Sequence, residues 1–255
     1  MRGRTTMHRM TRAATSLQQI ARRLARQLDA LAWPTPSHVY DPLVYAWDGY
    51  AQFLQRFGEA KGRVLIVGMN PGPWGMAQTG VPFGNVSAVR DWFHIDTKLM
   101  RALPEQHPKY PILGMACTRD EGSGKRLWGW AAERVGTPER FFERFFTWNY
   151  CLLLFLGEGH NLIPSALSAA EQRQLQGPCD AALRGAVERL APRAIVALGR
   201  YAQARVQAVV GGGVPVCYLL HPSPANPTAN RRWPEFAEAA LGPWLPPTGG
   251  AGTAR

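Results

Sequence analysis

The stretch "VLIVGMNPGPWGMAQTGVPFG", residues 64–84, begins as a buried strand and continues as a loop rich in glycine and proline. The unbroken apolar run that ends at Gly68 is typical of a strand that is covered on both faces of a sheet. In the loop, glycine removes side chains and proline removes backbone donors, yet one amide, Asn70, is kept at the start. This combination predicts a rigid loop that approaches a ligand closely.

Further apolar runs predict three more strands, at residues 146–155, 194–199 and 214–220. Helical patterns lie between and after them, at residues 168–190, 201–210 and 234–241. Strands that alternate with helices predict an α/β fold, and their near-continuous apolar composition predicts a parallel sheet covered on both faces. In such a sheet the ligand binds beyond the carboxyl ends of the strands, and those ends deliver Asn70, Asn149, Arg200 and His221.

The composition, with 46% hydrophobic and 18% charged residues in 255, is typical of one compact domain. The net charge of +11 is concentrated at the start, where seven arginines and no acidic residue precede residue 27. Without those seven, 22 of the 29 basic residues face 18 acidic ones, so charge alone supports a polyanionic partner only weakly. We expect a flexible basic leader at residues 1–12, a single domain at residues 13–245 and a disordered tail at residues 246–255.

The start of the chain also bears on membrane association and targeting. Leucines and an isoleucine recur at helical spacing from Leu17 to Leu31, which predicts an amphipathic helix that docks on the domain by its apolar stripe. A membrane or targeting helix is the alternative, and the acid-free, arginine-rich start also resembles an organelle presequence. No apolar run approaches the roughly 20 residues of a membrane span, so we expect no membrane partner.

The four cysteines form no CxxC pair and have no histidine at a matching spacing, so neither a zinc site nor an iron-sulfur site is predicted. We expect reduced, packed thiols at Cys117, Cys151, Cys179 and Cys217.

The residues at the strand ends do not fit the common catalytic loops. The first loop lacks the Lys-Ser/Thr of a P-loop and the spacing of a dinucleotide fingerprint, and Ser223 is not on a G-x-S-x-G elbow. What remains is a set of neutral hydrogen-bonding groups with aromatic neighbours, which suits a planar heterocycle such as uracil. Asn149 would pair with its edge and Phe83 would stack on its face. Phe83 as core packing and Asn149 as a cap for a neighbouring loop stay open as alternatives.

Several segments together resemble the single-strand-selective monofunctional uracil-DNA glycosylases. The longest are "GMNPGPWGMAQTGVPFGNVSAVRDW" from residue 68 and "HPSPANPTANRRW" from residue 221. Shorter matches, in the expected order, are "SGKRLWG" at 123–129, "NYCLL" at 149–153, "NLIP" at 161–164 and "ALGR" at 197–200. The resemblance spans roughly residues 35 to 243.

The resemblance implies a three-layer α/β/α sandwich around a short four-stranded parallel sheet. It implies hydrolysis of the N-glycosidic bond of uracil, and of 5-hydroxymethyluracil, in single- and double-stranded DNA, leaving an abasic site and using no cofactor or metal. The implied catalytic residues are Asn70, which positions water, and His221, which binds O2 of the base. The implied base-binding residues are Met69, Gly72, Phe83 and Asn149, with Gly72 leaving the C5 side of the base open.

The second motif is implied to contact DNA. By this resemblance, the residues that we expect at the DNA are Ser223, Pro224, Ala225, Asn226, Arg231 and Arg232. Ala225 stands where the family usually has an arginine that is wedged into the duplex, so activity on duplex DNA is in doubt. Trp74 replaces the usual phenylalanine, and Leu152 replaces a proline that follows the cysteine. No lysine lies in either motif loop, which fits an enzyme that cannot cleave the strand through a Schiff base.

Two other functions remain as alternatives. One is a non-catalytic module that binds uracil or other damage, and the other is a glycosylase that prefers mismatched uracil or the deaminated purines xanthine and hypoxanthine. We expect a monomer that acts on DNA in the bacterial cytoplasm, associated with the nucleoid, or in the nucleus of a eukaryotic cell.

Overall fold

The computed structural model describes residues 15–100, 103–224 and 226–246. The expected leader at residues 1–12, Ala225, and all of the expected tail except Pro246 therefore lie outside the described residues.

The centre of the fold is a four-stranded parallel sheet in the order β3-β2-β6-β7. Its strands are β2 (Val64–Gly68), β3 (Phe145–Asn149), β6 (Ala194–Leu198) and β7 (Val216–Leu219). Every residue of β2, β3 and β6 is buried, as their unbroken apolar sequences predict, whereas β7 is the half-exposed edge. Gly68 is in register with Asn149, so the two strand ends lie next to each other at the carboxyl edge.

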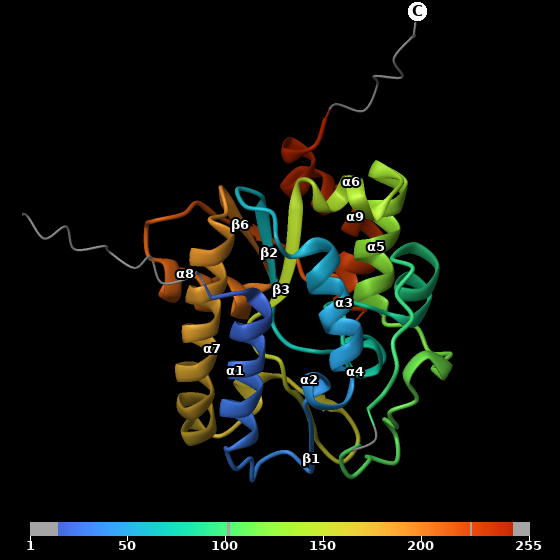
Figure 1. Ribbon diagram of the computed structural model, residues 1–255, viewed down its shortest axis with the longest axis vertical. Coiled ribbons are helices and arrows are strands. Elements are labelled where there is room, and N and C mark those ends of the chain that lie inside the picture. Colours follow the sequence, from blue (N-terminus) through green and yellow to red (C-terminus); the bar gives the residue numbers. More distant parts are fainter. Residues whose placement is uncertain (1–14, 101–102, 225, 247–255) are drawn as a thin grey trace, which may run out of the picture.

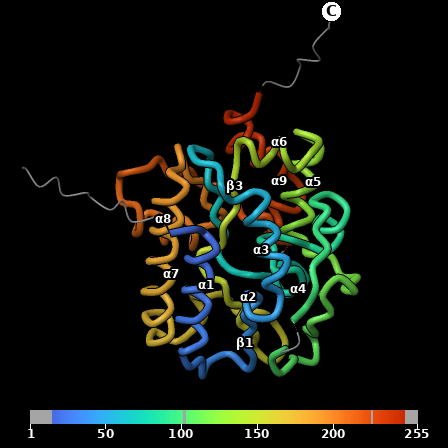
Figure 2. Tube along the Cα trace, in the orientation of Figure 1, coloured from blue at the N-terminus to red at the C-terminus, as the bar shows by residue number. Residues whose placement is uncertain are grey.

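Helices cover both faces of this sheet, which confirms the predicted three-layer α/β/α arrangement. Figure 1 shows α1, α7 and α8 on one side of the strands and α3, α5, α6 and α9 on the other, and the trace in Figure 2 follows the same order. The helices are α1 (Leu17–Asp29), α2 (Pro42–Tyr45), α3 (Trp47–Phe57), α4 (Met76–Thr79), α5 (Gly122–Val135), α6 (Pro138–Phe142), α7 (Ala169–Leu190), α8 (Arg200–Val210) and α9 (Pro227–Leu241). Shorter helical turns are η1 (Ala88–Trp92), η2 (Gly114–Ala116), η3 (Pro164–Ala166) and η4 (Gly242–Trp244).

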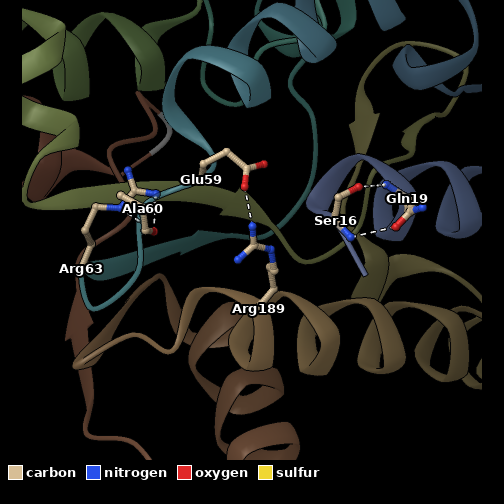
Figure 3. Close-up of polar contacts among 6 residues, drawn as sticks. All are labelled: Ser16, Gln19, Glu59, Ala60, Arg63 and Arg189. Carbon is tan, nitrogen blue, oxygen red and sulfur yellow. Dashed lines mark hydrogen bonds and ion pairs between the residues drawn. The ribbon is translucent and has the colours of Figure 1, made fainter. Parts of the chain in front are cut away.

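The N-terminal helix is docked as its leucine stripe predicts. Leu17, Leu24 and Leu28 are buried and α1 packs along α7, so the apolar face is covered by the protein itself. A capping box starts the helix, because the Ser16 side chain accepts from the Gln19 N–H and the Gln19 side chain accepts from the Ser16 N–H (Figure 3). The same view shows Glu59, after α3, paired with Arg189 of α7.

The predicted strand at residues 146–155 is wrong as a single element. The chain leaves the parallel sheet after Asn149 and forms β4 (Leu154–Leu156) in a second, antiparallel sheet with β1 (His38–Tyr40) and β5 (Asn161–Leu162). Residues 150–156 are all buried, so the apolar run carries no mark of the change of sheet. Asn149 thus stands where the chain turns out of the central sheet.

The last helix is longer than predicted, because α9 begins at Pro227 rather than at residue 234. Asn226 caps it by accepting from the N–H groups of Thr228 and Ala229, and Pro227 suits the first turn, where no N–H is needed. Pro234, taken as a start signal, lies inside the helix. The second motif therefore runs directly into α9.

All four cysteines are free, three of them buried and Cys217 half-buried, as predicted. No helix in the described part of the chain is long and apolar enough to span a membrane.

Candidate functional site

A pocket of about 430 Å³ opens at the carboxyl edge of the central sheet. Its walls come from the loop after β2, the end of β3, the start of α5 and the loop after β7, as expected for a parallel sheet. The lining residues are Met69, Asn70, Pro71, Gly72, Pro73, Trp74, Met76, Phe83, Tyr110, Asp120, Glu121, Gly122, Ser123, Asn149, Asn161, Ile163, His221, Ser223 and Pro224. The predicted catalytic and base-binding residues are thus brought together in one place.

Asn149 has a buried amide at the inner end of the pocket. Its Nδ2 donates to Sδ of Met76 at 3.3 Å, whereas its Oδ1 accepts no hydrogen bond from any described residue. A buried carbonyl oxygen without a donor costs about 1–3 kcal/mol. Oδ1 is therefore suited to a ligand that brings its own N–H.

Gly68 places Asn149 beside Phe83. A Cβ added to Gly68 would overlap Oδ1 of Asn149 and Cζ of Phe83, and it would lie 3.2 Å from Cε1 of Phe83. Only glycine lets the strand pass this close, so the last residue of β2 fixes a ring and an amide side by side. The cap alternative for Asn149 does not hold among the described residues, because its oxygen has no backbone partner there.

Phe83 is held in a backbone conformation that most residues avoid, with φ 57°. Its carbonyl oxygen accepts from Nε1 of Trp128 at 2.8 Å and from the N–H of Asn85 at 3.0 Å. A Cβ added to Gly124 of α5 would overlap the same oxygen. The ring packs with the core and is 9% exposed, which agrees with the core alternative, and it also lines the pocket.

Asn70 has its donor end engaged. Nδ2 donates to the carbonyl oxygens of Pro71 and Leu153, both at 3.3 Å. An amide so held turns its Oδ1 away from those carbonyls, where it can accept from a water or a hydroxyl group. It cannot take a proton as a base, so the side chain can orient water and no more.

His221 has an imidazole whose pKa is perturbed by burial. Burial lowers the pKa of His221 to about 4, so the imidazole is neutral at physiological pH. Its Nδ1 accepts from the N–H of Ser223 at 3.2 Å, which places the single ring hydrogen on Nε2. The site thus presents a neutral N–H donor.

The loop that carries His221 is fixed through alternate carbonyls. The carbonyl oxygen of Leu220 accepts from Nε1 of Trp233 at 2.9 Å, and that of Pro222 accepts from Nη1 of Arg126 at 2.7 Å. The next, that of Pro224, accepts from Nδ2 of Asn230 at 2.9 Å. These bonds come from α5 and α9, so two helices hold the imidazole in place.

Glu121 is a pocket residue that the sequence did not predict. It stands two residues before the "SGKRLWG" segment, and a Cβ added to Gly72 would overlap its Oε2. A carboxylate therefore stands in the space beside Gly72, where the resemblance implies an open C5 side of the base. Asn161, Ile163 and Tyr110 also line the pocket and were not predicted as site residues, although Asn161 and Ile163 belong to the matching segment "NLIP".

Some residues expected at the DNA lie outside the pocket. Arg231 and Arg232 are exposed on α9, where Arg232 pairs with Glu235 at 2.6 Å, and Asn226 caps that helix. Ser223 and Pro224 do line the pocket. In the part of the chain that the structure describes, no cluster of three or more His, Cys, Asp or Glu residues could hold a metal ion.

Known proteins match this chain over most of its length. The family model described as "Uracil DNA glycosylase superfamily" matches residues 55–241. The single-strand selective monofunctional uracil-DNA glycosylase of Rattus norvegicus is 44% identical over 224 residues, which cover 86% of this chain and 80% of that protein. The protein of the same name from Bos taurus is 44% identical over 207 residues, which cover 80% of this chain and 76% of the relative.

Among solved structures, the crystal structure of wild-type Pedobacter heparinus SMUG2 has a TM-score of 0.56 to this chain at 16% identity. The match covers 80% of this chain and 87% of the other. At that identity it shows that the two chains share a fold.

Proposed function

Because the chain belongs to the uracil DNA glycosylase superfamily and is a monofunctional uracil-DNA glycosylase of DNA repair, we propose that it flips uracil into the pocket beside Asn149. There it hydrolyses the N-glycosidic bond and leaves an abasic site. The observation that carries this proposal is the buried, unpartnered Oδ1 of Asn149 next to the ring of Phe83. We extend the substrates to 5-hydroxymethyluracil.

Base recognition would use one amide and one ring. Uracil presents an N–H at N3 and an oxygen at O4 on adjacent positions, and the Asn149 side chain presents the complementary pair. Oδ1 would accept from N3, while Nδ2 would exchange its weak bond to Met76 for O4. Phe83 would stack on the face of the base. Cytosine has no hydrogen at N3 and would leave Oδ1 unpaired.

His221 would stabilise the leaving base. Cleavage leaves negative charge on the base and oxocarbenium character on the sugar. A neutral Nε2–H aimed at O2 stabilises that charge as it develops, and losing one such donor typically costs about 10²- to 10³-fold in rate. A neutral imidazole holds its Nε2 hydrogen tightly, so it can donate a hydrogen bond to O2 without protonating the leaving base.

Asn70 would orient the attacking water through Oδ1, while its Nδ2 is held by the carbonyls of Pro71 and Leu153. Since an amide supplies neither a base nor a negative charge, most of the rate enhancement would come from stabilising the leaving group. We therefore expect a slower enzyme than glycosylases that have an aspartate at this place.

DNA would reach the pocket with the nucleotide turned out of the stack, at a cost of a few kcal/mol that is least in single strands and mismatches. Ser223 and Pro224 lie at the pocket, while Arg231 and Arg232 would contact the flanking phosphates from α9. No lysine lines the pocket in the described chain, so no amine is placed to form a Schiff base with the sugar. We propose that the enzyme acts as a monomer where the DNA is, in the bacterial cytoplasm or a eukaryotic nucleus.

The test uses labelled single-stranded and duplex oligonucleotides that contain uracil, 5-hydroxymethyluracil, thymine, xanthine or hypoxanthine. After incubation with the enzyme they are treated with alkali, which cleaves abasic sites. We expect cleavage at uracil and 5-hydroxymethyluracil, and none before alkali. Binding to uracil DNA with no cleavage would indicate a damage-binding module. Preference for a mismatched base or a deaminated purine would assign the pocket to another substrate.

A further inference from the structure

A uracil enzyme must leave thymine alone, and the two bases differ only by the methyl group at C5. With Asn149 on N3 and O4 and His221 on O2, the C5 side of the ring faces the remaining wall of the pocket. The lining residues on the remaining walls include the first loop and Glu121, the residue before α5. Resting on the proposed function, we infer that the carboxylate of Glu121 is the group that rejects thymine and accepts a C5 substituent bearing a hydroxyl group.

Glu121 occupies the space that a side chain at residue 72 would fill. A Cβ added to Gly72 would overlap Oε2 of Glu121 and lie 2.7 Å from its Cδ. A Cβ added to Gly75 would lie 2.8 Å from its Cγ. Both glycines therefore make room for one glutamate, whose stem lies on Gly75 and whose carboxylate stands beside Gly72.

Burial sets the electrostatic surroundings of this carboxylate. Burial raises the pKa of Glu121, and the nearby polar groups of Ser123 and Trp74 act in the opposite direction by favouring the charged form. In the described chain no salt bridge reaches Glu121, whereas the adjacent Asp120 pairs with Lys125 at 2.7 Å. Among the described residues, the wall thus holds a carboxylate acceptor without an ion-pair partner.

The chemistry of this wall distinguishes C5 substituents. With only a hydrogen at C5, as in uracil, the carboxylate keeps the water that solvates it. A methyl group pressed against it removes that solvent and returns no hydrogen bond, which is costly for a charged oxygen. A hydroxymethyl group displaces the same solvent but donates a charge-assisted hydrogen bond in return. Sites built to bind a hydroxyl group discriminate strongly against analogues that lack it, because the protein group is left unpaired.

The experiment measures single-turnover excision of uracil, 5-hydroxymethyluracil and thymine from single-stranded oligonucleotides by the full-length protein. Glu121→Gln keeps the volume and removes the charge, while Glu121→Ala removes both. Glu133→Gln, an exposed glutamate further along α5, is the matched control. Ratios between substrates are compared, because a general disturbance of the loop would slow every substrate alike.

We expect Glu121→Gln to lower the ratio of 5-hydroxymethyluracil to uracil excision by about fivefold to tenfold, with thymine still refused. Glu121→Ala should lower that ratio as well and raise the ratio of thymine to uracil excision by about tenfold or more. Should Glu121→Ala fail to fold, the ratio for Glu121→Gln decides alone.

Equal losses on all substrates, or ratios within about twofold of wild type, would overturn the inference while uracil excision stands. If the wild-type enzyme released no base at all, the proposed function would fall first.

Discussion

Replacing His221 by glutamine should make the protein lose less stability in acid than the wild type loses. The perturbation removes one imidazole whose pKa burial lowers to about 4, and it leaves a neutral side chain of similar reach. Other acidic and basic groups are common to both proteins, so they cancel when the two pH dependences are compared.

The magnitude follows from the two protonation states. At pH 7 and above, His221 holds no extra proton in the folded or the unfolded chain, and it contributes nothing to the pH dependence. Below about pH 6.5 the unfolded imidazole takes up a proton, while the folded one stays neutral until about pH 4. The free energy of unfolding therefore falls by about 1.4 kcal/mol for each pH unit between these values, or about 3 kcal/mol in all.

The assay is urea unfolding, followed by tryptophan fluorescence, at pH 7, 6, 5 and 4 for both proteins. We expect the wild type to lose about 3 kcal/mol more than His221→Gln between pH 7 and pH 4. His160→Gln, which removes an exposed imidazole, controls for the loss of a histidine as such. Parallel curves for wild type and His221→Gln would show that His221 is not held neutral in the folded protein, and the proposal of a neutral donor would lose its basis.

Three further predictions concern other residues. Asn70→Ala should lower single-turnover excision of uracil by about 10²-fold while the Kd for uracil DNA, measured by anisotropy, changes little; an unaltered rate would rule out its role in placing water. Burial raises the pKa of Asp41 to about 7; the hydrogen bond from the Leu43 N–H opposes this shift, and the charge of Asp29 adds to it. Because the unfolded chain loses this proton from about pH 4 and the folded chain keeps it to about pH 7, the free energy of unfolding falls as the pH rises from about 4 to 7. Asp41→Asn, which can keep the cap on Leu43, should raise Tm by several degrees at pH 8 and little at pH 4; equal shifts at both would contradict this. By the family resemblance, Ala225→Arg should speed excision from duplex DNA more than from single strands, and equal gains would count against a wedge at this position.

The fold was largely predictable because the inner strands of the central sheet are buried on both faces and therefore appear in the sequence as apolar runs. Val64 to Gly68 and Ala194 to Leu198 match their strands closely. The prediction of a single strand from residue 146 to residue 155 was wrong for the same physical reason, since burial in one sheet and burial in the next give the same apolar sequence. Strands of two or three residues, such as Asn161–Leu162, are too short to show any period.

The site divides in a similar way. Asn70, Asn149 and His221 were predictable because parallel strands deliver their carboxyl ends to one edge. Glu121 was not, because its approach to Gly72 depends on how α5 packs against the first loop, and a lone glutamate before a helix has many other uses. The same limit applies to Arg126, whose bond to the Pro222 carbonyl joins segments 96 residues apart.

The unpartnered oxygen of Asn149 also bears on how the catalytic cycle ends. Free uracil keeps the N3 hydrogen and the O4 atom of the nucleotide, so the released base still satisfies the buried Oδ1 that has no donor in the empty pocket. Departure of the product uncovers that atom again, at about 1–3 kcal/mol, whereas the abasic strand leaves without this cost. Turnover should therefore slow as free uracil accumulates, and the enzyme's own product becomes its competitor.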